Sequence, residues 1–411
     1  MNARHLTTCR TLAVLFVLGL STTNTSLAAV TWKNIQFGGF ASQGFLVNTG
    51  NNDYLGDTSG GTFDFREYAL NASWSKGKFR VGAQGFGQRL GNYGDDKIVL
   101  DWAIVDYQAT QWFGIRAGRV KMPRGLYNEA LDVDSVRPFV LLPQSVYDAR
   151  LRDFNSAING GMIYGNINLR RFGSLDYKAF YGDIPMSTDS GANDYFNNDV
   201  PYPNVKIGMD AVYGGSLFWN TPKSGLRVGY SYSAFQDFGA DRFLTMDIPP
   251  YGLIQFIMYR NTDRYDRHLL SAEYATGDWT FAAEIGQEEA DFLIGIPAEV
   301  PTGILAVDNI YGYLSATRRI NDRLEIGAYY SYTKEQQTSV NIVDGLIFPD
   351  LIQHDFAISA KYDINERWLV KVEGHYLDGA GKIFDTPSWP QPLAKRDESW
   401  FLLAAKATFS F

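Results

Sequence analysis

One polar stretch of the chain, residues 122–157, concentrates charged side chains of both signs. Its arginines are Arg124, Arg137, Arg150 and Arg152, and its acids are Glu129, Asp132, Asp134, Asp148 and Asp153. Opposite charges that face each other across a narrow passage create a transverse field, which orders water and discriminates among solutes. The alternative is a solvated surface loop with weak local ion pairs. We favour the passage because the stretch is long for a loop within a compact fold.

A second set of charges recurs at alternate positions of short segments elsewhere in the chain. The basic members are Arg80, Arg116, Lys178, Arg227, Lys361, Lys371 and Lys406, and the acidic members are Asp176, Glu284, Glu325 and Glu373. If each segment is a strand, these side chains share the face opposite to the apolar one. The slight basic excess favours anions, whereas a salt-bridge network that only stiffens the wall is an equally good interpretation.

Arg119 and Lys121 do not fit this pattern. Both are an odd number of positions from Arg116, so they would lie on the opposite, apolar face of the strand. A charged side chain that faces lipid destabilises a barrel strongly in the middle of the bilayer and only slightly near its surface. Either a β-bulge at Gly118 reverses the facing, or both residues already lie at the level of the following loop. We favour the bulge.

Catalytic and metal-binding patterns are absent from the sequence. After the N-terminal segment the histidines are His268, His354 and His375, and none has a Ser/His/acid spacing. Gly82, Gly85 and Gly87 lie inside a predicted strand rather than in a phosphate-binding turn. The sequence therefore predicts no enzyme, no cofactor and no metal.

The N-terminus has the features of an export signal. Arg4 and Arg10 precede an apolar core at 12–20, and Ser26-Leu27-Ala28 provides small residues for cleavage. We predict a signal peptide at 1–28, which removes the single cysteine, Cys9, and with it any disulfide or thiolate site. Losing Arg4 and Arg10 also takes the formal charge from −8 to −10, which argues against nucleic-acid binding.

The rest of the chain alternates apolar and polar residues in short segments joined by brief turns, as in 225–232, 278–285 and 323–332. Such alternation indicates strands with one apolar face. We predict sixteen strands, near 32–47, 63–75, 78–90, 98–110, 112–122, 157–167, 174–183, 208–220, 225–236, 266–276, 278–287, 307–319, 323–335, 353–363, 367–378 and 398–411. The alternation is weakest in 98–110 and 157–167.

Short turns alternate with long polar loops, namely 184–207, 237–265, 288–306, 336–352 and 379–397. No segment has 18 consecutive apolar residues, which excludes a helical membrane protein. No second apolar layer is available to cover the apolar faces. The sequence thus predicts an all-β protein, a transmembrane antiparallel β-barrel over 29–411, with short periplasmic turns, long external loops and a water-filled interior.

Two segments carry a resemblance to a known family. The last strand ends at Phe411, as in Gram-negative outer-membrane proteins. The segment from Arg116 to Glu129, with Arg119, Lys121 and Arg124 between them, resembles the strand-to-loop region of trimeric porins, including the phosphate-selective group. In that family the third external loop folds into the lumen, which would be 122–157 here.

The resemblance implies an outer-membrane porin that passes small hydrophilic solutes or ions by passive diffusion, and we expect a mild anion preference. It also implies a homotrimer, contact with membrane lipid and lipopolysaccharide, and recognition by the barrel-assembly machinery through Phe411. A channel specific for phosphate, a sugar or an organic acid is the main alternative, and an outer-membrane enzyme or an adhesin is a weaker one.

Overall fold

A computed structural model describes residues 30–50, 52, 54–55, 58–91, 93–188, 190, 192–193, 204–248, 250–295, 301–340, 351–379 and 397–411. The predicted signal peptide lies outside the described residues, as does most of the predicted loop 379–397. Within the described part of the chain, no helix is long and apolar enough to cross a bilayer.

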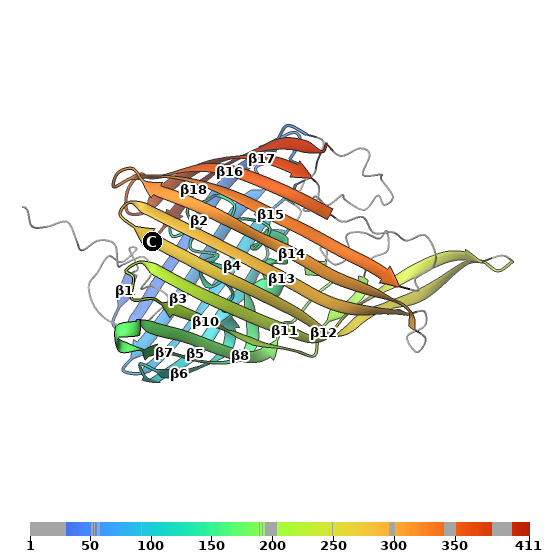
Figure 1. Ribbon diagram of the computed structural model, residues 1–411, viewed down its shortest axis with the longest axis horizontal. Coiled ribbons are helices and arrows are strands. Elements are labelled where there is room, and N and C mark those ends of the chain that lie inside the picture. The colour runs from blue at the N-terminus through green and yellow to red at the C-terminus, as the bar shows by residue number, and fades with distance from the viewer. Residues whose placement is uncertain are drawn as a thin grey trace, which may run out of the picture.

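The chain forms a closed antiparallel barrel of 16 strands (Figure 1). Its strands are β2 (Ile35–Asn48), β3 (Phe65–Lys76), β4 (Phe79–Leu90), β5 (Ile98–Thr110), β6 (Phe113–Lys121), β7 (Ala157–Asn168), β8 (Ser174–Asp183), β10 (Ala211–Asn220), β11 (Leu226–Ile248), β12 (Gly252–Thr276), β13 (Trp279–Gly295), β14 (Pro301–Arg319), β15 (Leu324–Val340), β16 (Leu351–Asp363), β17 (Trp368–Gly379) and β18 (Ser399–Ser410). β18 pairs with β2 and closes the ring. Closure leaves the barrel wall without an unpaired strand edge, which a bilayer requires because it offers no water to backbone groups.

Shorter elements complete the fold. β1 (Val30–Trp32) forms a small hairpin with β2, and β9 (Asn204–Gly208) pairs with β11 beyond the end of β10. The helical turns are η1 (Asn128–Ala130), η2 (Ala149–Leu151), α1 (Arg152–Asn155) and η3 (Arg170–Phe172). The first three of these belong to the connection between β6 and β7, residues 122–156, which we call the inner loop.

Each of the sixteen predicted strands overlaps a strand of the barrel, but part of the loop prediction is wrong. The predicted loop 237–265 is mostly strand, because β11 and β12 continue as one long hairpin, with Ala240 opposite Arg260 and Phe243 opposite Ile257. This hairpin projects beyond the other strands in Figure 1. β13, β14 and β15 also extend into the predicted loops. Strands of a hairpin pair with each other outside the bilayer as well as inside it, so a more polar composition does not end them.

The outer surface of the barrel is apolar around the whole ring. Large exposed side chains occur at every second position of neighbouring strands, including Leu70, Val105, Leu217, Leu270, Ile285, Leu314, Ile326, Ile358 and Leu403. Exposed aromatic residues flank the short turns, including Trp74, Phe79, Trp219, Trp279 and Trp368. An apolar band bounded by aromatic residues matches the hydrocarbon core and interface of a membrane.

The inner surface is less polar than the sequence suggested. Away from the short turns, Val212, Phe235, Phe238, Tyr265 and Phe292 are buried in one apolar cluster inside the barrel. Residues of the inner loop, among them Phe154, and of β9 pack against the cluster. Part of the interior is therefore a packed core rather than a wall facing water.

An arginine on the outer surface should destabilise the barrel according to its depth. Ile358, which is 70% exposed, lies in the middle of β16, and Ile364 lies at the short turn that follows. We expect Ile358→Arg to lower the free energy of unfolding by ~2–4 kcal/mol and Ile364→Arg by ~0–1 kcal/mol. Denaturant unfolding in liposomes measures both, and equal effects at the two depths would contradict a membrane-embedded belt.

Candidate functional site

The inner loop begins with a sharp turn at the end of β6. The Met122 N–H donates to the Ser156 carbonyl, and the Arg124 N–H donates to the Met122 carbonyl. Pro123 has no N–H to continue the strand ladder. Gly125 has φ +59°, and a Cβ at this position would lie 2.5 Å from Glu284 Oε1. Glycine is therefore required for the chain to turn inward this close to β13.

Glu284 on β13 anchors the start of the inner loop. Its carboxylate accepts hydrogen bonds from the Leu126 N–H (3.0 Å) and from the hydroxyls of Ser271, Tyr147 and Tyr313. Glu284 is 3% exposed. Four donors around one buried carboxylate offset part of its lost hydration and fix the position of the loop.

Glu373 on β17 holds the middle of the inner loop in a similar way. Its two oxygens accept the N–H groups of Val140 (2.9 Å) and Leu141 (3.0 Å). His375 lies beside it, with Nε2 at 2.9 Å from Glu373 Oε1 and Nδ1 at 3.0 Å from Asp355. The loop is thus bonded to β13 and to β17, which are four strands apart in the ring.

A buried ionic cluster lies between these anchors. Asp134 of the inner loop contacts Lys371 on β17 (3.0 Å), Lys406 on β18 (3.2 Å) and Arg137 (2.8 Å). Glu67 on β3 shares Arg137 and Lys406. Burial by itself raises the pKa of Asp134, but the three cations outweigh it and hold the pKa well below its usual range.

A second ionic cluster joins the inner loop to β4, β5 and β6. Asp132 contacts Lys121 and Gln84, while Asp101 contacts Lys121 (3.2 Å) and Arg152 (2.6 Å). Burial raises the pKa of Asp132, but Lys121 and Arg152 outweigh it and lower the pKa to about 2. Since the two clusters and the glutamate anchors lie on β3–β6, on β13 and on β17–β18, the inner loop runs across the interior of the barrel.

The structure also places the remaining predicted site residues. Glu129 pairs with Lys178, and Arg150 pairs with Asp148, so both loop residues have partners inside the barrel. Near the short turns, Arg116 pairs with Asp106 (2.8 Å), Arg227 pairs with Glu273 (3.0 Å), and Arg80 lies opposite Asp106 in the sheet register. Most of the predicted charges are therefore neutralised by a carboxylate.

The predicted bulge at Gly118 is wrong. The pairing of β6 with β5 and β7 continues without a shift through Gly118, although its φ is +117°. Lys121, the last residue of β6, reaches the inner loop, and the Arg119 guanidinium donates to the Asp101 carbonyl (3.1 Å). The actual irregularity is in β5, where Asp101 is an extra residue between the pairs Gln84–Trp102 and Gly85–Leu100. This bulge turns Asp101 inward and explains why alternation fails in 98–110.

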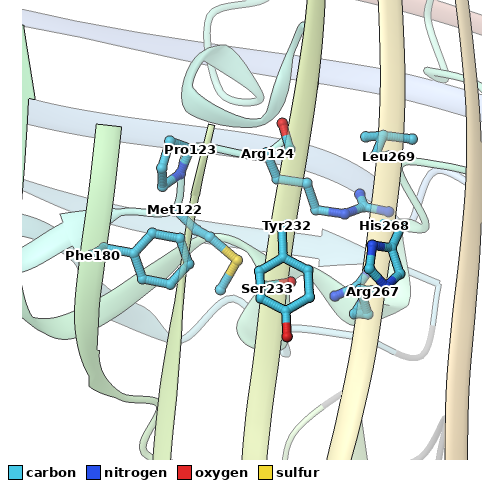
Figure 2. Close-up of a pocket in the computed structure, with 10 residues that line it drawn as sticks. Met122, Pro123, Arg124, Phe180, Tyr232, Ser233, Arg267, His268 and Leu269 are labelled. Atoms are coloured by element: carbon cyan, nitrogen blue, oxygen red, sulfur yellow. The ribbon is translucent and has the colours of Figure 1, made fainter. Parts of the chain in front are cut away.

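Two cavities adjoin the inner loop. The first lies between the start of the loop and β11–β12, and Figure 2 shows Arg124 extending from the loop toward β12 within it. The second lies between the loop and β12–β15, and its lining includes Arg124, Asp148, Arg267, Glu288, Asn309, Tyr311, Thr333 and Glu335. The sequence analysis did not point to Arg267, Glu288, Glu335 and Tyr311, although the parity of Glu288 with Glu284 would have placed Glu288 inward.

Acid should weaken the attachment of the inner loop through Asp132. Because its folded-state pKa of about 2 lies below the unfolded value of ~3.9, its carboxylate stabilises the fold above about pH 4 and loses this effect as the pH falls toward 2. We expect Asp132→Asn to be less stable than wild type at pH 7 and to depend less on pH between 4 and 2. Denaturant unfolding across this range tests the prediction. Asp322→Asn, on an exposed short turn, is the control that should follow wild type.

Comparisons with known proteins agree on the fold. No family model matches the sequence, and no curated protein matches it. Among solved structures, OmpT of Vibrio cholerae in a trimer form is 13% identical with a TM-score of 0.51, covering 92% of this chain and 99% of that one. An anion-selective porin from Comamonas acidovorans is also 13% identical with a TM-score of 0.51, covering 92% of this chain and 99% of that one. The outer membrane channel DcaP of Acinetobacter baumannii is 10% identical with a TM-score of 0.54, covering 93% and 100%. The chain therefore has the sixteen-stranded barrel fold of outer-membrane porins.

Proposed function

We propose that the protein is an outer-membrane porin that lets small hydrophilic solutes or ions cross by passive diffusion. The observation that carries the proposal is the inner loop, which crosses the interior of a membrane-type barrel and brings charges of both signs to face the wall. Across the second cavity, Arg124 and Arg267 lie among Asp148, Glu288 and Glu335. Such a charged region is where a wide barrel selects its solutes.

We also propose a mild preference for anions. In the first ionic cluster the cations Lys371, Lys406 and Arg137 outnumber the acids Asp134 and Glu67, whereas at the second cavity three acids face Arg124 and Arg267. Arg124 adds a buried charge whose hydrogen-bond acceptors are neutral. The fold is shared with a porin described as anion-selective, which supports the same direction. The preference should be mild because most cations have a carboxylate partner.

A solute-specific channel is the second candidate, and one observation favours it. The apolar cluster around Phe235 and Phe238 occupies part of the interior that an unspecific pore would leave to water. We propose no enzymatic function, because Nδ1 of His268 and Nδ1 of His354 each lie against a tyrosine hydroxyl, and His375 is held by two carboxylates.

The shared barrel fold is also the basis for a proposed assembly. We propose a homotrimer embedded in lipid and lipopolysaccharide, in line with the trimer form described for OmpT of Vibrio cholerae. Phe411 completes the barrel in a way that fits recognition of this terminal strand by the assembly machinery, since its backbone N–H and carbonyl both bond to Gly39 (3.0 Å).

Ion conductance across a planar bilayer tests the proposal. In a KCl gradient we expect the wild-type protein to conduct with a reversal potential on the anion-selective side, and Arg124→Gln to move it toward cations. Arg318→Gln, on the exposed outer surface, is the matched control and should leave it unchanged. An absence of conductance would contradict the channel, whereas clear cation selectivity of the wild type would contradict only the anion preference.

Solute uptake separates the two kinds of channel. In liposome swelling with uncharged sugars of increasing size, a general porin should show rates that fall smoothly with size. A steep dependence on chemical class at constant size would instead support the solute-specific channel.

A further inference from the structure

The short turns of the barrel carry an uneven distribution of charge. They lie at the end opposite to the projecting hairpin (Figure 1). The five turns from the one between β1 and β2 to the one between β10 and β11 have six exposed basic residues in them or directly beside them, namely Lys33, Lys76, Lys78, Arg170, Arg171 and Lys223. We call these six residues the basic rim. The segments around the same turns contain no Asp or Glu, and they are 31–37, 73–80, 107–114, 168–175 and 219–226.

These five turns are neighbours along one arc of the barrel end. Their strands follow one another in the ring. The Ser75 N–H donates to the Asn34 carbonyl (3.3 Å), which joins the first turn to the second. The Trp219 ring N–H donates to the Phe172 carbonyl (2.8 Å), which joins the fourth to the fifth. The basic rim is therefore a continuous surface on one side of the barrel.

The other side of the same barrel end is mixed in charge. The three turns that follow β12, β14 and β16 have both signs in them or directly beside them, namely Asp278, Asp322, Asp363 and Glu366 with Arg319, Arg323 and Arg367. Because the whole chain has a formal charge of −8, an arc of cations without acids does not follow from the composition. The positive potential at this end of the barrel belongs to the side formed by β1–β11.

The cations of the basic rim keep their charge uncompensated. Among the described residues, no carboxylate forms an ion pair with any of the six. Lys33 Nζ lies 4.9 Å from the centre of the Trp32 ring, and the guanidinium carbon of Arg171 lies 4.8 Å from the centre of the Phe172 ring. An aromatic ring attracts a cation without neutralising it. The rim can therefore accept negative charge from outside the protein.

The depth of the basic rim indicates what supplies this charge. Trp32, Trp112 and Phe172 are 60%, 59% and 57% exposed beside these turns, and exposed aromatic residues mark the interface of a bilayer. Each turn has only two to five residues. The headgroup layer on each side of a bilayer is about 5–7 Å thick, so turns this short stay within it. The cations are thus placed among lipid headgroups rather than in the periplasm, where a soluble protein would bind.

We propose that the basic rim binds the headgroups of anionic phospholipids, such as phosphatidylglycerol, in the periplasmic leaflet of the outer membrane. The phosphates accept charge-assisted hydrogen bonds from the lysine and arginine side chains. A single Lys or Arg near the membrane surface favours an anionic lipid about fivefold. The lipid layer around the barrel is therefore asymmetric, with anionic lipid enriched along β1–β11. The interaction goes beyond the proposed channel and does not depend on conductance.

Native mass spectrometry of the detergent-solubilised protein measures this preference. Phosphatidylglycerol and zwitterionic phosphatidylethanolamine with the same acyl chains are added in equal amounts. We expect the wild type to retain phosphatidylglycerol over phosphatidylethanolamine by about fivefold or more. The combined substitutions Lys76→Gln, Lys78→Gln, Arg170→Gln and Arg171→Gln should bring the ratio close to one. A wild type without the preference would overturn the proposal.

A matched variant controls for the loss of charge itself. The combined substitutions Arg318→Gln, Arg319→Gln, Arg323→Gln and Arg367→Gln remove the same number of exposed cations near the mixed turns. This variant should keep the wild-type preference. If it loses the preference as fully as the variant of the basic rim, the lipid responds to net charge alone and the proposal is overturned.

A photoreactive phosphatidylglycerol locates the lipid on the wild type and needs no variant to fold. Cross-linked peptides should come from the segments around the basic rim. Cross-links concentrated at 275–280, 318–325 and 362–368 would overturn the proposal.

Two competitors distinguish the other sources of negative charge. Neither inorganic phosphate nor a polyglutamate peptide, at the same concentration of charge, should prevent cross-linking by the lipid. Loss of the cross-links in phosphate would show a site for the free ion, and loss in polyglutamate would show a site for an acidic protein. Either result would overturn the lipid proposal.

Discussion

The requirement that every backbone N–H and C=O inside a bilayer has a hydrogen-bond partner determines the rest of this structure. An open sheet would leave two unpaired edges in hydrocarbon, so β18 must pair with β2. Once the ring of sixteen strands is closed, its circumference leaves an interior too wide for wall side chains alone to fill. The inner loop occupies part of that interior, and its shape follows from what the wall offers it.

Electrostatics then decides how the loop is held. Most of its backbone lacks a neighbouring strand, so wall carboxylates such as Glu284 and Glu373 accept its N–H groups. Buried carboxylates are tolerated only when donors or cations surround them, which explains why Asp134 lies among Lys371, Lys406 and Arg137. The charges that looked like selectivity elements in the sequence therefore serve largely to attach the loop.

The fold was predictable because its determinants are local. A period of two and a short turn are visible in the sequence, and they located all sixteen strands. Which side chains point into the barrel was less predictable, because one extra residue in a strand reverses the facing of every residue that follows it. The bulge at Asp101 is defined by pairing with Gln84 and Gly85 on β4, which no local pattern in β5 reveals. The length of β11 and β12 was missed for a related reason, since their ends pair with each other as a hairpin that projects beyond the barrel wall, where apolar alternation is not required.

The candidate site was predictable only as a set of charges, because selectivity depends on which charges remain after pairing. Arg150 and Arg124 look equivalent in the sequence, yet Arg150 is neutralised by Asp148 two residues earlier and Arg124 contacts only neutral acceptors. The left-handed turn at Gly125 brings the chain against Glu284, whose carboxylate accepts four hydrogen bonds from other donors than Arg124. The charge that the interior presents therefore depends on how each arginine is placed by the backbone, and not only on the number of basic residues.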